Sequence, residues 1–414
     1  MKNSWRKLDN AAKIFPSAAS KTDTQVFRFS CELKSAVKPE LLQKATEEAL
    51  ETFKIYQCTL RRGFFWYYLE DCDILPRVHE ENKPLCSQLY FKGGKNLLFD
   101  VSYFGTRINL DIYHVLCDGT GATEFFRQIL AKYLTAENNL PECPLDYDAS
   151  LSQMGDDSFD TYYSHAPAKN IPSCKNVCRL RKNREPGARL NAISGSMSVR
   201  AVLDAAHKYG ASLTAFLCAC LMDSINRTLT VRQKKHPIVI GIPVNLRKRF
   251  ESASARNFFS LIFSEYNFSA APDNFEQLIV KVENDLKNGL DKDNLSNIIN
   301  GYTATEHNIF VRLTPLPVKN FVLRIAHERS NNNMTAVISN MGRIDMPEPL
   351  QKYIDGFYIY ASTNALQICA CSFGDKLTLN FTSPFVDTEI QRHFFRYLSA
   401  LGIETEITTN LTDE

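Results

Sequence analysis

The sequence predicts an α/β protein in which mixed β-sheets are flanked by helices and the chain is divided into two parts. Alternating and helical segments follow one another without the regular strand-helix alternation of a doubly wound sheet. A segment rich in prolines and charges interrupts both patterns between Asn138 and about Ser194. The chain has 414 residues, 44% of them hydrophobic, which is enough to bury two substantial cores.

The first part mixes several strands with few helices. Residues 25–34 place apolar and polar side chains on opposite faces, which predicts a half-buried strand. Pro39 suits the first turn of a helix whose apolar residues recur at helical spacing. Core strands rich in aromatic residues are expected at 63–70, 96–104 and 107–114. A further helix is expected from Thr120, whose side chain would cap its start.

The interruption is the expected linker. Five prolines lie in it, followed by a basic run made of Arg179, Arg181, Lys182, Arg184 and Arg189. We therefore predict an N-terminal domain at 1–175, a basic linker at 176–194 and a C-terminal domain at 195–414.

The second part returns to alternating helices and strands. Helices are predicted at 198–210, ended by Gly210, at 211–229, capped by Ser212, from about Asp273, and at 388–401. Strands are predicted at 237–245, 258–269, 335–340, 357–362, 365–373 and 376–383. The last two strands flank a Gly-Asp pair and are expected to form a hairpin.

Composition excludes several classes of protein. A net charge of +2 does not favour binding to nucleic acid, and no window approaches a membrane span or a secretory signal. A cytoplasmic protein is the default expectation. The twelve cysteines are scattered, so we expect reduced thiols and no metal site, including at Cys174 and Cys178.

One histidine has the setting of a catalytic base. In residues 107–114 an apolar row ends at His114, where burial disfavours the imidazolium and keeps the ring able to accept a proton. Gly119 and the nearby Gly121 permit a tight turn into the next helix. Asp118 would orient the loop or pair with a distant arginine. A core histidine with no chemical role is the alternative.

The segment YHVLCDGTG resembles the His-x-x-x-Asp-Gly signature of a large acyltransferase superfamily. The superfamily includes chloramphenicol acetyltransferase, plant BAHD acyltransferases and nonribosomal peptide condensation domains. The order of further segments is closest to the alcohol acetyltransferase and mycobacterial polyketide-lipid acyltransferase branch; they are 8–16, 210–221, 242–250, 256–260, 338–345 and 377–398. The Asp-Phe-Gly-Trp-Gly element of the plant enzymes has only a poor match at 354–360, which argues against that branch.

This resemblance implies two chloramphenicol-acetyltransferase-like domains with an active-site tunnel at their junction. His114 matches the general base, and Asp118 matches an aspartate that holds the loop through an ion pair with an arginine. Arg247 is the first candidate for that arginine and Arg343 the second. Many members carry two successive histidines, whereas the first position here is Tyr113 on the opposite strand face.

The group that stabilises the oxyanion is open. Backbone amides near Gly119, or the side chains of Ser339 and Asn340, are the candidates. Cys117 lies inside the signature but has no group placed to activate it, so a packing role is expected. The basic run is interpreted as a solvated loop, with coenzyme A phosphates or an acidic carrier protein as the alternatives.

The predicted function is transfer of an acyl group from acyl-CoA to a small alcohol. Acyl-CoA is a co-substrate, and no permanently bound cofactor is expected. One alternative is a free-standing condensation-type enzyme that uses an acyl or peptidyl carrier protein and forms amides or esters with an alcohol or amine acceptor. Another is a binding protein that has kept the fold without catalysis, which the intact signature disfavours.

Overall fold

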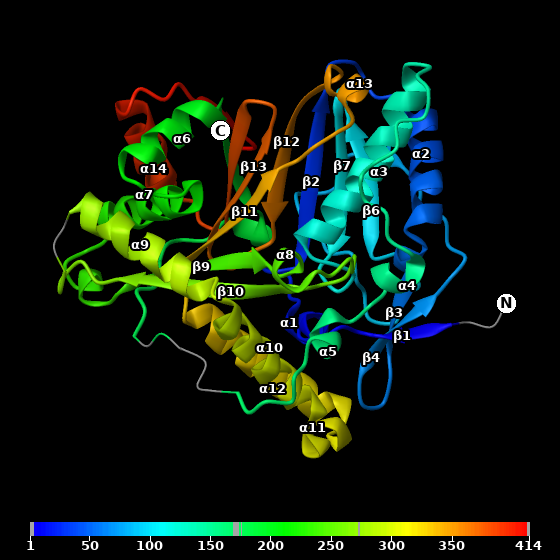
Figure 1. Ribbon diagram of the computed structural model, residues 1–414, viewed down its shortest axis with the longest axis horizontal. Coiled ribbons are helices and arrows are strands. Elements are labelled where there is room, and N and C mark those ends of the chain that lie inside the picture. Colours follow the sequence, from blue (N-terminus) through cyan, green and yellow to red (C-terminus); the bar gives the residue numbers. More distant parts are fainter. Residues whose placement is uncertain (1–3, 169–173, 175, 272–273, 412–414) are drawn as a thin grey trace.

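Three β-sheets organise the computed structural model, which describes residues 4–168, 174, 176–271 and 274–411 (Figure 1). The strands are β1 (Trp5–Lys7), β2 (Val26–Leu33), β3 (Cys58–Arg62), β4 (Tyr67–Asp71), β5 (His79–Glu80), β6 (Phe99–Phe104), β7 (Arg107–Tyr113), β8 (Asn191–Ser198), β9 (Ile238–Asn245), β10 (Phe259–Tyr266), β11 (Ala336–Arg343), β12 (Ile354–Ala361), β13 (Leu366–Phe373), β14 (Lys376–Ser383) and β15 (Glu406–Thr409). The helices are α1 (Phe15–Ala18), α2 (Pro39–Thr52), α3 (Gly119–Glu137), α4 (Leu151–Met154), α5 (Ser158–Thr161), α6 (Val199–Lys208), α7 (Leu213–Thr228), α8 (Arg247–Phe250), α9 (Phe275–Gly289), α10 (Lys292–His307), α11 (Ile309–Leu313), α12 (Leu316–Asn332), α13 (Glu348–Gln351) and α14 (Glu389–Ala400).

The sheets are mixed and have helices against their faces. Their strand orders are β12-β2-β7-β6-β5, β10-β9-β11-β13-β14-β8-β15 and β1-β4-β3. Most neighbours are antiparallel, but β11 is parallel to β9 and β13, and β5 is parallel to β6. Helices α2 and α3 lie beside the five-stranded sheet, and α6, α7, α9 and α14 beside the seven-stranded sheet (Figure 1). The predicted fold class is therefore confirmed.

Strand β2 is buried on both faces, so the prediction of a half-buried strand is wrong. Its polar side chains lie beside those of the neighbouring strand β7 on the same face of the sheet, where Arg28 Nη2 donates to Asp111 Oδ2 at 2.7 Å and Ser30 Oγ donates to Asn109 Oδ1 at 2.7 Å. Burial of these groups is tolerated because each is hydrogen-bonded to a partner. The alternation identifies the strand but does not show what covers its polar face.

The aromatic segment 63–70 forms a core strand only in its second half, where Leu69 of β4 is buried, and its first half is the tip of a hairpin. Strand β4 begins only at Tyr67, and at the β3–β4 tip the side chains of Phe64 and Phe65 are 72% and 38% exposed. Strand β1 pairs with β4 and completes the small sheet. Trp66 alone of this segment lines the cavity described below.

The second part of the chain contributes a strand to the sheet of the first part. Although β12 comes from the second part, it pairs antiparallel with β2 and becomes the edge of the five-stranded sheet. Strand β8 begins at Asn191, so the last residues expected in the linker lie inside the seven-stranded sheet. Strand β12 therefore links the two parts. The domain boundaries at 175 and 194 stay predictions.

Helices α10, α11 and α12 lie in a stretch for which the sequence patterns predict no element. Helix α11 has no buried residue, and α12 buries only Leu316 and Lys319. Their apolar residues occur on exposed faces too, which removes the single stripe that identifies an amphipathic helix. None of the described helices combines the length and hydrophobicity that crossing a bilayer requires. The cytoplasmic location stays a prediction.

Candidate active site

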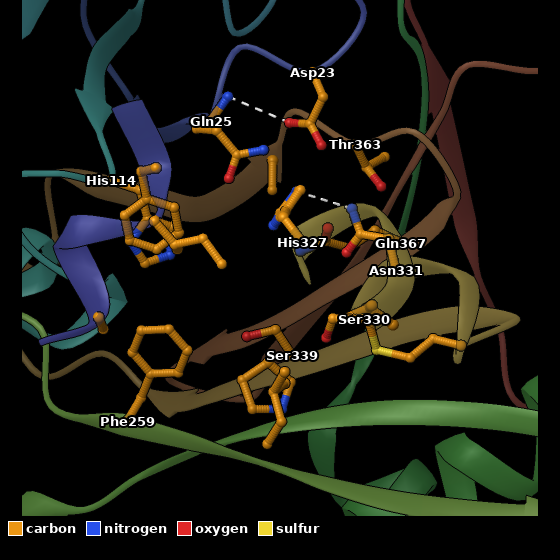
Figure 2. A pocket seen from close by; sticks show the side chains of 18 of the residues that line it. Asp23, Gln25, His114, Phe259, His327, Ser330, Asn331, Ser339, Thr363 and Gln367 are labelled. Carbon is orange, nitrogen blue, oxygen red and sulfur yellow. Dashed lines mark hydrogen bonds between the residues drawn. The ribbon is translucent and has the colours of Figure 1, made fainter. Parts of the chain in front are cut away.

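A cavity of about 990 Å³ lies between the five-stranded and seven-stranded sheets, and His114 lines it (Figure 2). One wall comes from β2 and β12, and another from β9, β10, β11 and β13. Side chains of α12 also line it. The junction of the two parts, where a tunnel is predicted, therefore contains a cavity large enough for a drug-sized molecule.

His114 follows the last residue of β7 and is tightly held. Its backbone amide donates to the Gln25 carbonyl oxygen at 2.9 Å. The imidazole stacks on the Phe15 ring with centroids 4.4 Å apart, and the rings of Phe27 and Phe259 lie at 5.1 and 5.5 Å. Three aromatic neighbours restrict the imidazole to one orientation and exclude much of the water around it.

Asn257 determines which nitrogen of His114 carries the proton. Its Nδ2 donates to the His114 carbonyl oxygen at 3.1 Å and to Asp9 Oδ2 at 3.2 Å, so its Oδ1 is the atom that lies 3.0 Å from His114 Nδ1. An oxygen acceptor at Nδ1 requires the proton there. The neutral ring therefore has its lone pair on Nε2.

The environment of His114 favours the neutral ring. Burial lowers its pKa from the usual 6.5, and the charge of Asp118 is the largest of the opposing effects, which include the hydrogen bond with Asn257. At neutral pH the imidazole is uncharged and able to accept a proton.

Asp118 organises the loop after His114. It is the N-cap of α3, and its Oδ1 accepts hydrogen bonds from the amides of Thr120 and Gly121 at 3.1 Å each. Its Oδ2 accepts from Arg247 Nη1 and from the Phe258 amide at 2.8 Å each. These bonds engage both carboxylate oxygens. The predicted capping by Thr120 is wrong, because Asp118 provides the cap and the helix begins at Gly119.

Arg247 links the His114 loop to the segment that carries Asn257. Besides the bond to Asp118, its Nε donates to the Ser254 carbonyl oxygen at 2.7 Å and its Nη2 to that of Arg256. The side chains of Arg247 and Asp118 are 9% and 7% exposed. The structure brings Arg247 to Asp118, whereas Arg343 pairs with Asp345 and is 66% exposed. The second candidate arginine is therefore wrong.

The glycines of the loop are needed for close contacts and not for a turn. Neither Gly119 nor Gly121 has a positive φ. A Cβ on Gly121 would lie 2.1 Å from the Ala255 carbonyl oxygen, whereas a Cβ on Gly119 would meet only the flexible end of Met341. The expected tight turn is present at residues 114–116, where the Leu116 amide donates to the Tyr113 carbonyl oxygen at 2.9 Å, but it does not use the glycines. Gly121 matters more than Gly119 for the approach of the two segments.

The structure separates the candidates for oxyanion stabilisation. The amides of Thr120 and Gly121, close to Gly119, already donate to Asp118. Asn340 Nδ2 donates to Thr214 Oγ1 at 3.0 Å, and its Oδ1 accepts from the Gly342 amide at 2.9 Å. Ser339 lines the cavity and points toward the side where His114 and Phe259 lie (Figure 2). Its hydroxyl donates to Met341 Sδ at 3.9 Å, and because a thioether is a weak acceptor, Ser339 is the best placed of the side-chain donors.

Tyr113 and Cys117, which lie close to His114 in the sequence, are buried away from the cavity. Tyr113 is fully buried and stacks on Tyr90, with ring centroids 5.9 Å apart and planes within 4°. Cys117 is also fully buried, and burial raises the pKa of its thiol far above the usual 9.0. A thiol in this setting remains protonated and packs as an apolar group.

The basic run lies partly at the cavity. Arg179, Arg181 and Arg184 line it, and Arg184 Nη2 donates to the Asn364 carbonyl oxygen at 2.9 Å. Lys182 Nζ instead lies 2.6 Å from Asp387 Oδ1. The interpretation as a wholly solvated loop is therefore incomplete.

A group of polar side chains that sequence reasoning missed lines the cavity away from His114. Asp23 and Thr363 lie on one side of this polar end and His327 and Asn331 on another (Figure 2). Asn331 Nδ2 lies 2.9 Å from His327 Nε2, and burial raises the Asp23 pKa to about 6. Asn257 and Phe15 were also not singled out, although both lie in segments that carry the resemblance, 256–260 and 8–16.

Within the described residues, no three His, Cys, Asp or Glu side chains are grouped so as to hold a metal ion. No family model matches the sequence, and neither does any curated protein.

Solved structures share the fold over almost the whole chain. TRI101 of F. graminearum, complexed with coenzyme A and deoxynivalenol, is 11% identical with a TM-score of 0.67, covering 97% of this chain and 99% of its own. A mutant starter condensation domain of rhizomide synthetase RzmA, in complex with C8-CoA and Leu-SNAC, is 11% identical with a TM-score of 0.62, covering 96% and 94%. Polyketide synthase associated protein 5 from Mycobacterium tuberculosis is 16% identical with a TM-score of 0.58, covering 96% and 98%.

The chain has the condensation-domain and chloramphenicol-acetyltransferase-like fold. This fold is the one that the resemblance implies. At these identities the likeness concerns the fold, so the chemistry of the site is argued from its own residues.

Proposed function

We propose that the protein transfers an acyl group from an acyl-CoA thioester to the hydroxyl group of a small acceptor, with His114 as the general base. The observation that carries the proposal is the pair formed by His114 and Asn257 at the cavity wall. It provides a neutral imidazole with its Nε2 lone pair free, which is the state that a general base requires.

The proposed reaction needs no group beyond the two substrates and this site. His114 Nε2 takes the hydroxyl proton while the acceptor oxygen attacks the thioester carbonyl carbon. The tetrahedral intermediate then expels the thiolate of coenzyme A, which receives the proton from the imidazolium. Ser339 is the proposed donor to the oxyanion, because its hydroxyl lies at the cavity and its own acceptor, Met341 Sδ, is weak, whereas the Thr120 and Gly121 amides and the Asn340 side chain donate to oxygen atoms.

Asp118 and Arg247 are proposed to position the base without touching substrate. The bonds of Asp118 to Arg247 and the Phe258 amide hold the segment that carries Asn257 against the His114 loop. Loss of this link would free Asn257 and with it the tautomer of His114.

Coenzyme A as the donor is supported by the neighbours of the same fold whose structures contain it or a CoA thioester. The second candidate is a condensation-type reaction with a carrier-bound thioester and an alcohol or amine. It is supported by the condensation domains among the neighbours. A third, non-catalytic role would leave the His114–Asn257 pair without a purpose.

The test measures thiol release from a panel of acyl-CoAs with mixed alcohols and amines. His114→Ala should lower kcat by about 10²-fold or more, since a general base supplies at least that factor. His327→Ala, in the second histidine that lines the cavity, is the matched control and should retain the chemical step. Equal turnover by wild type and His114→Ala would contradict the assignment of His114 as the general base.

The same assay distinguishes the alternative functions. Turnover with acyl carrier protein alone would favour the condensation-type reaction, and thermal stabilisation by acyl-CoA without turnover would favour a binding protein.

A further inference from the structure

Helices α11 and α12 and the β3–β4 hairpin tip form a projecting end of the molecule (Figure 1). These elements carry exposed apolar side chains. We call this surface the apolar edge. Its large side chains are Phe64, Phe65, Ile309, Phe310, Leu313, Val318, Phe321 and Val322. Phe310 is 80% exposed and Phe321 is 67% exposed. So many adjacent apolar groups in water are costly unless something covers them, and such patches mark interaction sites.

The apolar edge is fixed by contacts that do not use its exposed side chains. The Leu316 amide donates to the Phe64 carbonyl oxygen at 3.0 Å, and Lys319 Nζ donates to that of Phe65 at 2.9 Å. The Lys319 ammonium also lies over the Trp66 ring. Leu316 and Lys319 are buried, whereas Val318, Phe321 and Val322 follow the spacing of one outward face of α12. Packing therefore does not explain the outward side chains.

The charges around the apolar edge are predominantly positive. Residues 308–333 contain the basic residues Arg312, Lys319, Arg324 and Arg329 and a single acidic residue, Glu328. The three arginines are exposed, as is Arg62 beside the hairpin tip. Aromatic and aliphatic side chains flanked by cations complement an apolar phase beneath anionic head groups.

The same helices form part of the cavity wall. Leu323 and His327 of α12 and Val311 of α11 line the cavity, while other residues of these helices form the apolar edge. A lipid surface held at this edge would lie next to the cavity wall, where an acyl chain or an apolar acceptor could pass between them.

We propose that the apolar edge docks the protein onto lipid surfaces that carry anionic head groups. A second copy of the chain is a poorer occupant, because a symmetric contact would bring the same exposed arginines together. A convex, projecting edge also suits insertion between lipids better than contact with a flat protein face. The proposal does not depend on the acyl-transfer reaction.

The test is cosedimentation of the full chain with vesicles of phosphatidylcholine alone and with about 30% phosphatidylglycerol. Wild type should bind the anionic vesicles at least about tenfold more strongly than the neutral ones. The double variant Phe310→Asp with Phe321→Asp should lose at least about tenfold in binding to the anionic vesicles. The matched control, Phe91→Asp with Phe104→Asp, changes two side chains that are each 57% exposed elsewhere and should bind like wild type.

A second variant distinguishes the contribution of the arginine charges to vesicle binding from that of the apolar side chains. The test then does not depend on one pair of substitutions. Arg312→Gln with Arg329→Gln should weaken binding to anionic vesicles and leave any binding to neutral vesicles unchanged. Melting temperatures within the error of wild type confirm that each variant is folded. Absence of binding to both vesicles by folded wild type would overturn the proposal. So would a concentration-dependent dimer, or a complex with an acidic protein, that the Phe310 and Phe321 substitutions abolish while vesicle binding is unaffected.

Discussion

The His114 loop and the polar end of the cavity each contain a histidine, an asparagine and an aspartate, but they hold them differently. At the loop, both carboxylate oxygens of Asp118 are bonded, and the Asn257 side chain forms three hydrogen bonds, two with His114 and one with Asp9. At the polar end, Asp23 accepts from the Gln25 amide at 3.3 Å and from the side chains of Ser362 and Gln25, and it is not paired with a cation among the described residues. A fully bonded site fixes geometry for chemistry, whereas a loosely bonded site leaves groups free to meet a ligand.

Asp118→Asn should have the largest effect, because it leaves Arg247 buried without its anion. We expect a loss of about 3–5 kcal/mol in the free energy of unfolding. Activity should also fall, since the segment carrying Asn257 is released. Denaturant unfolding at neutral pH and thiol release measure the two effects. A stability within about 1 kcal/mol of wild type would contradict the role assigned to the pair.

The same substitution at the polar end, Asp23→Asn, should raise the free energy of unfolding at neutral pH, whereas Asp118→Asn lowers it. Burial raises the pKa of Asp23 from 3.8 to about 6, so the folded protein holds this proton more tightly than the unfolded chain does. The free energy of unfolding of wild type should therefore decrease as the pH rises from 3.8 to about 6. Asp23→Asn removes this decrease and should stabilise the protein at pH 7 by up to about 3 kcal/mol.

Denaturant unfolding at several pH values between about 4 and 7 measures this effect. Wild type and Asp23→Asn should converge at the acidic end of the range and separate at the neutral end. Curves that stay parallel over the whole range would show that Asp23 ionises normally, and the contrast between the two aspartates would then not hold.

Asn257→Ala and Asn331→Ala compare the partners of the two histidines. Asn257→Ala should lower kcat by about 10-fold to 10²-fold, because the imidazole loses the group that sets its tautomer. The hydrogen bond with Asn257 raises the pKa of His114, so its loss lowers that pKa further and moves the acidic limb of the pH profile to lower pH. Asn331→Ala should change KM without moving this limb. An unmoved limb in Asn257→Ala would reduce Asn257 to a purely structural role.

Sequence reasoning reached the loop more completely than the polar end, and the cause is local. His114, Asp118 and Gly119 lie within six residues of one another, and the strand phase of residues 107–114 places the histidine on the apolar row. Asn257 is 143 positions away, and Asp23 and His327 lie in segments without a recognisable pattern. Side chains brought together only by the packing of two sheets carry no spacing that a sequence can reveal.

The fold shows the same limit. Strands with clean alternation, such as β2, were predictable as strands, but their coverage depended on partners elsewhere. Helices α11 and α12 were not predicted, because their apolar residues face both the cavity and the solvent. The pairing of β12 with β2 could not be predicted, since nothing in the alternating residues of β12 selects β2 over a strand of the second part.

Gly121→Ala and Gly119→Ala should give the smallest effects and test whether the loop is as tightly packed as the comparison requires. Alanine favours a helix by up to about 1 kcal/mol over glycine. At Gly121 the new methyl group would lie 2.1 Å from the Ala255 carbonyl oxygen, a backbone atom next to the segment of Asn257, so we expect a net loss of about 1–2 kcal/mol. At Gly119 the contact is the end of the Met341 side chain, which can turn away, so stability should be unchanged within about 0.5 kcal/mol. Equal stability of the two variants in thermal unfolding would mean that the His114 loop and the 254–258 segment can separate without loss of stability. The His114 loop would then be no more constrained than the polar end of the cavity.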